Sequence, residues 1–258
     1  MPEGDTVWNT ARLLHRALAG RVLTRSEFRV PRFATTDLTG QTVTEAVSRG
    51  KHLLIRTDKG LTVHSHLRMD GFWRTRPAAE RLRDSHRIRL ILANDAWLAA
   101  GYLLGMVEVL PTEREEKVTG HLGPDLLGPG WDAAEAVRRL RGDPDRPAAE
   151  ALLDQRNLAG IGNVIATEML FLRGISPGRP IGQVDDLNAL VQFGRRLLDA
   201  NKARFDRVTT GDRGRGQRTW VYGRAAEPCR RCGTMIRRGE QGAPGEERVS
   251  YWCPSCQR

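Results

Sequence analysis

The sequence predicts an α+β protein of several domains: an N-terminal β-sandwich, a helical domain and a C-terminal zinc-binding β-hairpin. After one helix-like stretch, apolar residues recur with strand spacing as far as residue 110. A Gly- and Pro-rich stretch at residues 120–130 then separates these segments from residues with helical periodicity. All four cysteines lie near the C-terminus. We therefore expect domains at residues 1–120, 121–218 and 219–258.

The first domain should begin with a helix from Thr6 to Leu18, with Asp5 or Thr6 as N-cap and Gly20 as its stop. Eight short segments with turn signals between them then predict antiparallel strands. A helix followed by such strands is typical of a β-sandwich or flattened barrel. The segments are Val22–Val30, Val43–Val47, His52–Thr57, Leu61–His66, Phe72–Thr75, Arg87–Ala93, Ala96–Ala100 and Leu104–Leu110.

The second domain should contain four helices. Asp132 would cap the first, which runs to Leu140, and Pro147 would open the second, which runs to Leu153. The other two are expected over Gly162–Arg173 and Val184–Lys202.

A tight turn with two glycines opens the third of these helices and ends in Asn163. Backbone N–H groups at such a helix start suit a phosphate, and the Asn163 amide would add a donor. The alternative is a turn that serves packing alone.

The charge balance points to a polyanionic partner. The chain has 258 residues, a net charge of +10 and a pI near 10.3, which favours nucleic acid. An anionic membrane is the alternative, but no apolar run approaches the ~20 residues that span a bilayer, and no signal peptide opens the chain. We therefore expect a cytoplasmic, nucleoid-associated protein. Lysine occurs only four times, and one of these lysines, Lys51, lies between two predicted strands, where it could reach a phosphate.

The cysteines form two Cys-x-x-Cys pairs, Cys229 with Cys232 and Cys253 with Cys256. This spacing predicts one structural zinc ion per chain, and the alternative is unligated buried cysteines. Met235-Ile236, a turn around Gly242–Gly245 and Val249–Trp252 read as a β-hairpin between the pairs. Arg258, just beyond the last ligand, could grip a phosphate.

Pro2 would become the N-terminal residue if Met1 is removed. Its secondary amine could attack a sugar carbon, and the neighbouring Glu3 could move protons at the same centre. The alternative is an ordinary start before a helix.

A second candidate stretch is the turn that contains Arg68 and Met69. An apolar wedge beside a cation is the arrangement that proteins use to unstack DNA. His64 and His66 could share a face as metal ligands, but no third ligand is nearby in the sequence, so we do not expect a metal there.

These residues, in this order, resemble the formamidopyrimidine-DNA glycosylase and endonuclease VIII family of base-excision repair enzymes. The resemblance implies an N-terminal β-sandwich, a helix–two-turns–helix domain and a zinc β-hairpin. The stretches that carry it are Pro2-Glu3-Gly4, Gly50-Lys51, His66–Gly71, Leu122–Asp125, Asp154–Asn163, Val221–Arg224 and Cys256-Gln257-Arg258.

The resemblance also implies roles for individual residues. Pro2 would attack the deoxyribose C1′ of a damaged nucleotide, Glu3 would protonate the sugar, and Lys51 would serve proton transfer or phosphate contact. Asn163 and Arg258 would hold phosphates beside the flipped nucleotide. Glu168, which we count with the DNA-binding residues, would orient the N-terminus near Pro2. The implied activity is that of a bifunctional DNA glycosylase and AP lyase that nicks DNA by β,δ-elimination.

Two departures favour the endonuclease VIII branch, which prefers oxidised pyrimidines. The purine-specific branch carries an Asp-Pro-Arg-Arg-Phe-Gly loop, whereas Trp97–Leu103 here has no such arginine or phenylalanine. The segment before Val221 that would cover the lesion is short. We expect a monomer acting on damaged duplex or single-stranded DNA. The alternative is a non-catalytic zinc-finger protein that binds damaged or branched DNA and would not need Pro2 beside Glu3.

Overall fold

The computed structural model describes residues 2–204, 206–242 and 247–258, and it divides into two compact units between His121 and Leu122. The helices after residue 121 and the cysteine-rich hairpin belong to one and the same unit. No helix in these described ranges is long and apolar enough to cross a membrane.

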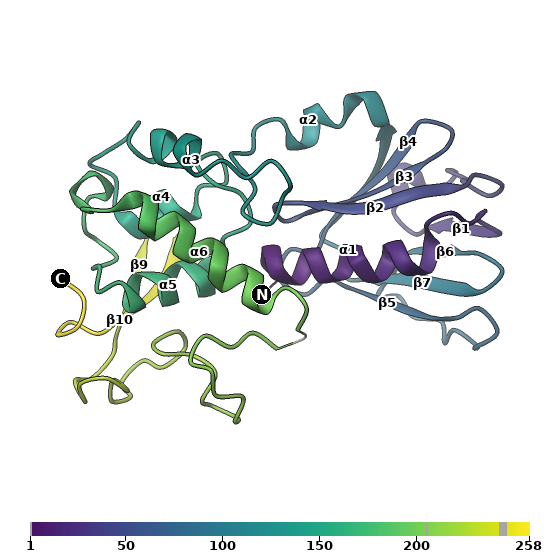
Figure 1. Ribbon diagram of the computed structural model, residues 1–258. Helices are drawn as coiled ribbons and strands as arrows, with labels where there is room; N and C mark the ends of the chain where they lie inside the picture. The colour runs from purple at the N-terminus through teal and green to yellow at the C-terminus, as the bar shows by residue number, and fades with distance from the viewer. Residues whose placement is uncertain (1, 205, 243–246) are drawn as a thin grey trace. The chain divides into compact units, whose positions relative to one another are not determined.

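The first unit holds helix α1 (Gly4–Leu18) and two four-stranded antiparallel sheets, which confirms the predicted β-sandwich (Figure 1). One sheet has the order β1-β6-β7-β5, with β1 at Arg25–Phe28, β6 at Ile88–Ala93, β7 at Trp97–Tyr102 and β5 at Phe72–Pro77. The other has the order β2-β3-β4-β8, with β2 at Val43–Arg49, β3 at His52–Thr57, β4 at Leu61–His66 and β8 at Met106–Pro111. The sequence did not predict three short helical segments, η1 (Pro31–Phe33), η2 (Thr112–Arg114) and α2 (Glu116–Thr119).

Alternation along the strands builds the core of this unit. Leu53, Ile55 and Val63 are buried in one cluster with Leu14 and Leu18 of α1. The helix packs on β2 and also contacts β3, β5 and β7, so it touches both sheets (Figure 1). The buried apolar face of α1 therefore closes the sandwich along one side.

Helix α1 begins earlier than predicted. Glu3, rather than Asp5 or Thr6, is the N-cap, and its carbonyl accepts a bond from the Val7 N–H at 3.0 Å. Asp5 lies in the first turn, where a negative charge interacts favourably with the helix dipole. The earlier start brings the helix up to Pro2.

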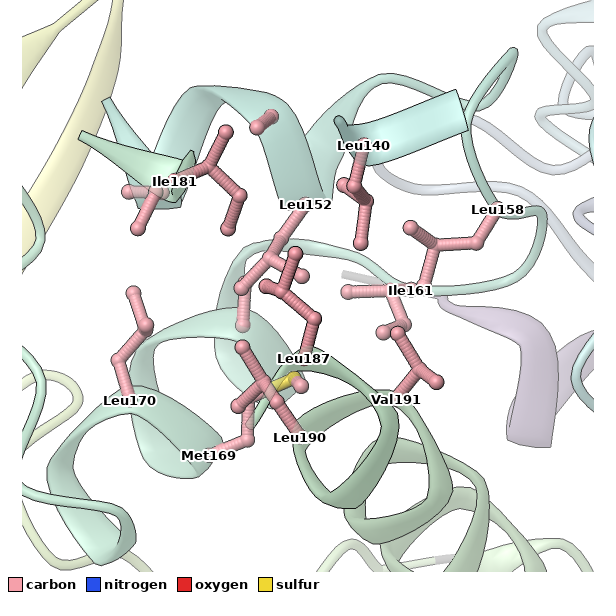
Figure 2. Packing of buried hydrophobic residues seen from close by; sticks show 14 of the residues in the cluster. Leu140, Leu152, Leu158, Ile161, Met169, Leu170, Ile181, Leu187, Leu190 and Val191 are labelled. Carbon is pink, nitrogen blue, oxygen red and sulfur yellow. The ribbon is translucent and has the colours of Figure 1, made fainter. Parts of the chain in front are cut away.

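The second unit contains the four predicted helices, α3 (Ala133–Leu140), α4 (Ala148–Leu153), α5 (Asn163–Leu172) and α6 (Leu187–Asn201), with a short η3 (Ile181–Gln183) before α6. Asp132 caps α3 as expected, since its side chain accepts from the Glu135 N–H at 3.0 Å. Asp186 caps α6 in the same way. Figure 2 shows the core of this unit, in which Leu152, Met169 and Leu190 are fully buried.

A two-stranded antiparallel hairpin completes the unit, with β9 at Arg237–Gln241 and β10 at Arg248–Trp252. Met235 and Ile236 were expected in the first strand but precede it. Part of the predicted turn at 242–245 lies outside the described residues. Strand β10 packs on α5, and a small core of Phe171, Val221, Ile236 and two cysteines lies beside it. The hairpin thus shares its core with the helical layer.

Candidate active site and nucleic-acid interface

Pro2 and Glu3 lie immediately before the first turn of α1. Glu3 and Asp5 are buried, and Pro2 is half-buried, so this stretch is packed rather than free in solvent. The start of a helix carries a partial positive charge, which favours the neutral and nucleophilic form of a nearby amine. The structure therefore places a proline beside a buried carboxyl group, in an environment suited to amine chemistry.

Lys51 lies at the tip of the β2–β3 hairpin, as predicted. Arg49 and His52 pair directly, so Gly50 and Lys51 form a two-residue loop. Gly50 has a φ of +56°. Glycine at the first central position is typical of the type II′ turn, which matches the twist of the flanking strands. The turn therefore holds Lys51 on a short, well-defined tip.

The Arg68-Met69 turn presents an exposed apolar side chain, because Met69 is 59% exposed. Arg68 has a φ of +52°, and its side chain lies over Gly105, where an added Cβ would come within 2.4 Å of the Arg68 Cγ. Nearby, Phe72 stacks on Tyr102 with ring centroids 4.9 Å apart. Sequence reasoning singled out Arg68 and Met69 but did not identify Gly105 or this aromatic pair.

The glycine turn before α5 is held by Gln155, which sequence reasoning did not single out. The Gln155 amide donates to the carbonyls of Leu153 and Ile161 at 2.8 and 2.9 Å, and it accepts from the Gly160 N–H at 3.1 Å. Gly160 has a φ of +104°, which favours glycine there. Three bonds from one side chain thus fix the turn that leads into Asn163.

Asn163 joins α5 to the hairpin, since its Nδ2 donates to the carbonyl of Val249 at 2.7 Å. A side-chain amide has two N–H groups, so this bond leaves the second N–H of Asn163 to donate to a phosphate. A pocket of about 490 Å³ lies here, lined among others by Asn163 and three arginines, Arg146, Arg156 and Arg248. Two carboxylates also line it, so the pocket keeps a net positive charge beside its N–H donors.

Two of these arginines also hold an acid. Arg156 and Arg146 hydrogen-bond the Asp154 carboxylate and hold its pKa well below the usual range. The Asp154 carboxylate therefore stays charged at neutral pH and keeps both guanidinium groups at the pocket.

Glu168 holds a turn of the second unit rather than lying at the surface. The carboxylate is fully buried and accepts bonds from the N–H groups of Trp220 at 2.7 Å and of Val221 and Tyr222 at 2.9 Å. It also accepts from the hydroxyl of Thr209. A buried carboxylate cannot touch DNA, so its expected place among the DNA-binding residues is corrected. We expect it to act through the turn that it holds.

The four cysteines converge on one point. Their sulfur atoms all lie within 4.8 Å of one another, and individual pairs are 3.4 to 4.0 Å apart. Four thiolates around zinc at about 2.3 Å would be about 3.8 Å apart, so the residues fit a tetrahedral site. Hydrogen bonds from Thr234 lower the pKa of the Cys232 thiol to about 6, whereas burial raises that of Cys256 to about 12.

Arg258 is exposed, but its backbone is anchored. Its N–H donates to the Gly174 carbonyl and its carbonyl accepts from the Ser176 N–H, both at 3.1 Å. The preceding Gln257 donates to the Ile175 carbonyl at 2.8 Å. The end of α5 thus holds this guanidinium group on a rigid base.

Comparison with known proteins adds the following. Residues 1–100 match the formamidopyrimidine-DNA glycosylase N-terminal domain, and residues 122–194 match the formamidopyrimidine-DNA glycosylase H2TH domain. A probable endonuclease 8 2 of Streptomyces coelicolor is 55% identical, over 100% of this chain and 94% of the relative. A DNA-(apurinic or apyrimidinic site) lyase Nei2 of Mycolicibacterium smegmatis is 50% identical, over 100% of this chain and 99% of the relative.

Solved structures share the fold. The formamidopyrimidine-DNA glycosylase of Lactococcus lactis, crystallised non-covalently bound to DNA containing an AP site, superposes with a TM-score of 0.81. The match covers 99% of each chain at 24% sequence identity.

Proposed function

Because the chain belongs to the formamidopyrimidine-DNA glycosylase and endonuclease VIII family, on the endonuclease VIII branch, we propose that it works through the amine of Pro2. The protein is a DNA glycosylase and AP lyase of base-excision repair. One observation carries the assignment of its nucleophile: Pro2 directly precedes the buried Glu3 at the ordered start of α1.

In this proposal the Pro2 nitrogen bonds to C1′ of the damaged nucleotide as the bond from C1′ to the base breaks. Glu3 gives a proton to the ring oxygen, the sugar opens, and an iminium ion forms. The iminium makes the 2′ hydrogen acidic, and its loss expels the 3′ phosphate; a second elimination expels the 5′ phosphate. Water then releases Pro2 from the sugar remnant. Lys51 serves proton transfer or phosphate contact at the hairpin tip.

DNA is held chiefly through its phosphates. Asn163, the pocket beside it and Arg258 supply donors, and four cysteine thiolates would hold one structural zinc ion that keeps the hairpin folded. Four thiolates leave no open position on zinc, so the ion would take no part in the chemistry. We further propose that the protein acts as a monomer.

The Arg68-Met69 turn would decide which lesions the enzyme prefers. Met69 would enter the gap left by the flipped nucleotide while Arg68 bonds the opposite strand. The chain lacks the arginine and phenylalanine loop of the purine-specific branch, so filling of the gap would be incomplete. We therefore propose a preference for poorly stacked lesions, such as oxidised pyrimidines and abasic sites.

Borohydride trapping tests the nucleophile. Incubation with duplex DNA containing an abasic site should yield a covalent complex, and peptide mapping should place the DNA on Pro2. A form that retains Met1 should bind this DNA but resist trapping, because its Pro2 nitrogen is an amide. Lys117→Ala removes an exposed amine and serves as the control, with undiminished trapping expected. Equal trapping of the Met1-retaining form would refute the role of Pro2, and binding without any trapping would favour a non-catalytic DNA-binding protein.

A further inference from the structure

Four of the six histidines gather on one face of the sheet formed by β2, β3, β4 and β8. The ring of His52 lies 5.0 Å from that of His64, 5.2 Å from that of His66 and 6.0 Å from that of His121, between centroids. Within the described ranges, only the four cysteines form a group whose ligand atoms could hold a metal ion. Hydrogen bonds, rather than a metal ion, connect these histidines.

A continuous hydrogen-bond chain runs through this cluster. Glu108 Oε1 lies 2.6 Å from His64 Nδ1, and His64 Nε2 lies 2.8 Å from His52 Nδ1. The strand register produces the chain, because His64 is directly opposite Glu108 and His52 is directly opposite His66. His64 in the middle is 1% exposed, so water does not compete for these bonds.

The chain fixes which nitrogen of each ring carries a proton. A carboxylate only accepts, so His64 carries a proton on Nδ1, and in its neutral form Nε2 then offers a lone pair. His52 must then donate through Nδ1, which leaves its Nε2 as an acceptor. At the other side of the cluster His66 Nδ1 accepts the Arg68 backbone N–H at 2.9 Å, so its proton lies on Nε2.

Burial, helped by nearby positive charges, keeps the rings of His52 and His66 neutral. Burial lowers the pKa of His52 to about 3, and His64, His66, His121 and Lys51 act in the same direction.

The pKa of His66 falls to about 4 through burial and through the charges of Lys51 and Arg68. Two carboxylates, Glu108 and Glu115, face His64 from the other side. At neutral pH the two rings nearest the hairpin tip therefore act as polar, uncharged neighbours of Lys51.

We propose that Glu108, His64 and His52 form a tautomer relay that positions Lys51 at the hairpin tip. His52 follows Lys51 directly in the chain, so a fixed ring orientation at His52 limits how the tip can move. The edge-on contact of His52 with His66 extends the relay to the backbone of Arg68, beside the wedge. The three relay residues act through Lys51 and need not touch DNA. The inference rests on the proposed role of Lys51.

NMR of the ring nitrogens tests the relay without reference to activity. At pH 7 long-range proton–nitrogen spectra should show Nδ1–H tautomers for His52 and His64 and an Nε2–H tautomer for His66. In Glu108→Ala the His52 signals should change to a mixture of tautomers. An Nε2–H or doubly protonated His52 in the wild-type protein overturns the proposal, whatever the fate of the Pro2 mechanism.

A double-mutant cycle tests the link to Lys51. Under single-turnover conditions on abasic DNA, Glu108→Ala should slow strand cleavage about tenfold, a coupling of the size that contacting residues show. In the Lys51→Ala background the same change should have little effect. Glu108→Gln keeps an acceptor for His64 and should recover most of the rate, and the exposed Glu113→Ala serves as the control.

The possible failures are distinguishable. An equal loss from Glu108→Ala in both backgrounds would mean that the relay supports the fold alone and would overturn the proposal. If wild-type protein gives no trapped complex while the three tautomers appear as expected, the proposed function fails and the hydrogen-bond relay stands.

Discussion

Replacing Glu168 by glutamine should loosen the turn at residues 219–222 and leave the rest of the fold in place. Oε1 accepts from Val221 and Tyr222, and Oε2 accepts from Trp220 and from the Thr209 hydroxyl. The amide oxygen of glutamine can replace Oε1, but its NH₂ group then faces the Trp220 N–H, donor against donor. The Thr209 hydroxyl can rotate and accept instead.

One buried N–H therefore loses its acceptor, which costs about 1–3 kcal/mol. Glu168→Ala removes all three backbone bonds and should cost more, up to about 5 kcal/mol, unless water reaches the turn. Amide hydrogen exchange measures this directly, since each ~1.4 kcal/mol raises the exchange rate of the affected N–H about tenfold.

We expect faster exchange at Trp220 in the glutamine variant, and at residues 220–222 in the alanine variant, with little change in the β-sandwich. The exposed Glu113→Gln is the control and should leave all these rates unchanged. Wild-type exchange at Trp220 in Glu168→Gln would refute the assignment of the carboxylate as the anchor of this turn.

Three further results are expected. Elemental analysis should find one zinc ion per chain, and Cys253→Ser should lose both zinc and DNA binding; a metal-free protein with wild-type affinity would contradict this. DNA affinity should fall steeply with salt, with a log–log slope of roughly −0.9 per neutralised phosphate. Arg258→Ala and Asn163→Ala should each weaken binding for every sequence and lesion, and a salt-independent affinity would refute this account. Single-turnover excision should be faster for thymine glycol than for 8-oxoguanine paired with cytosine, and Met69→Ala should slow it in duplex DNA; the reverse order, or an unchanged rate, would refute the wedge.

Local patterns in the sequence predicted the elements well. Strand alternation located all eight strands of the sandwich. Asp132 marked the start of α3, because its capping bond to the Glu135 N–H spans only three residues and is therefore visible in the local sequence. The hairpin was predicted less well. Ile236 was expected in a strand, but its N–H donates to the Glu227 carbonyl. This bond belongs to the loop that brings the thiols of the first cysteine pair together.

The side-chain contacts that sequence reasoning missed join residues far apart in the chain. Glu108 lies 44 residues from His64, and Glu168 lies 52 residues from Trp220, so no local spacing relates them. The sequence presented His64 and His66 as a pair without a third ligand. Only the strand register shows that His64 lies between Glu108 and His52.

The exposed groups that we propose to meet DNA each depend on another residue for their position. Gln155 holds the turn before Asn163, Gln257 anchors the chain beside Arg258, and Gly105 leaves room for the Arg68 side chain. Each exposed group must remain accessible, so a partner elsewhere has to supply its rigidity. A site of this kind is precise only if both layers are intact, because a misplacement of about 1 Å can cost roughly 100-fold in rate. Substitution of a supporting residue should therefore lower activity while every contact group is still present.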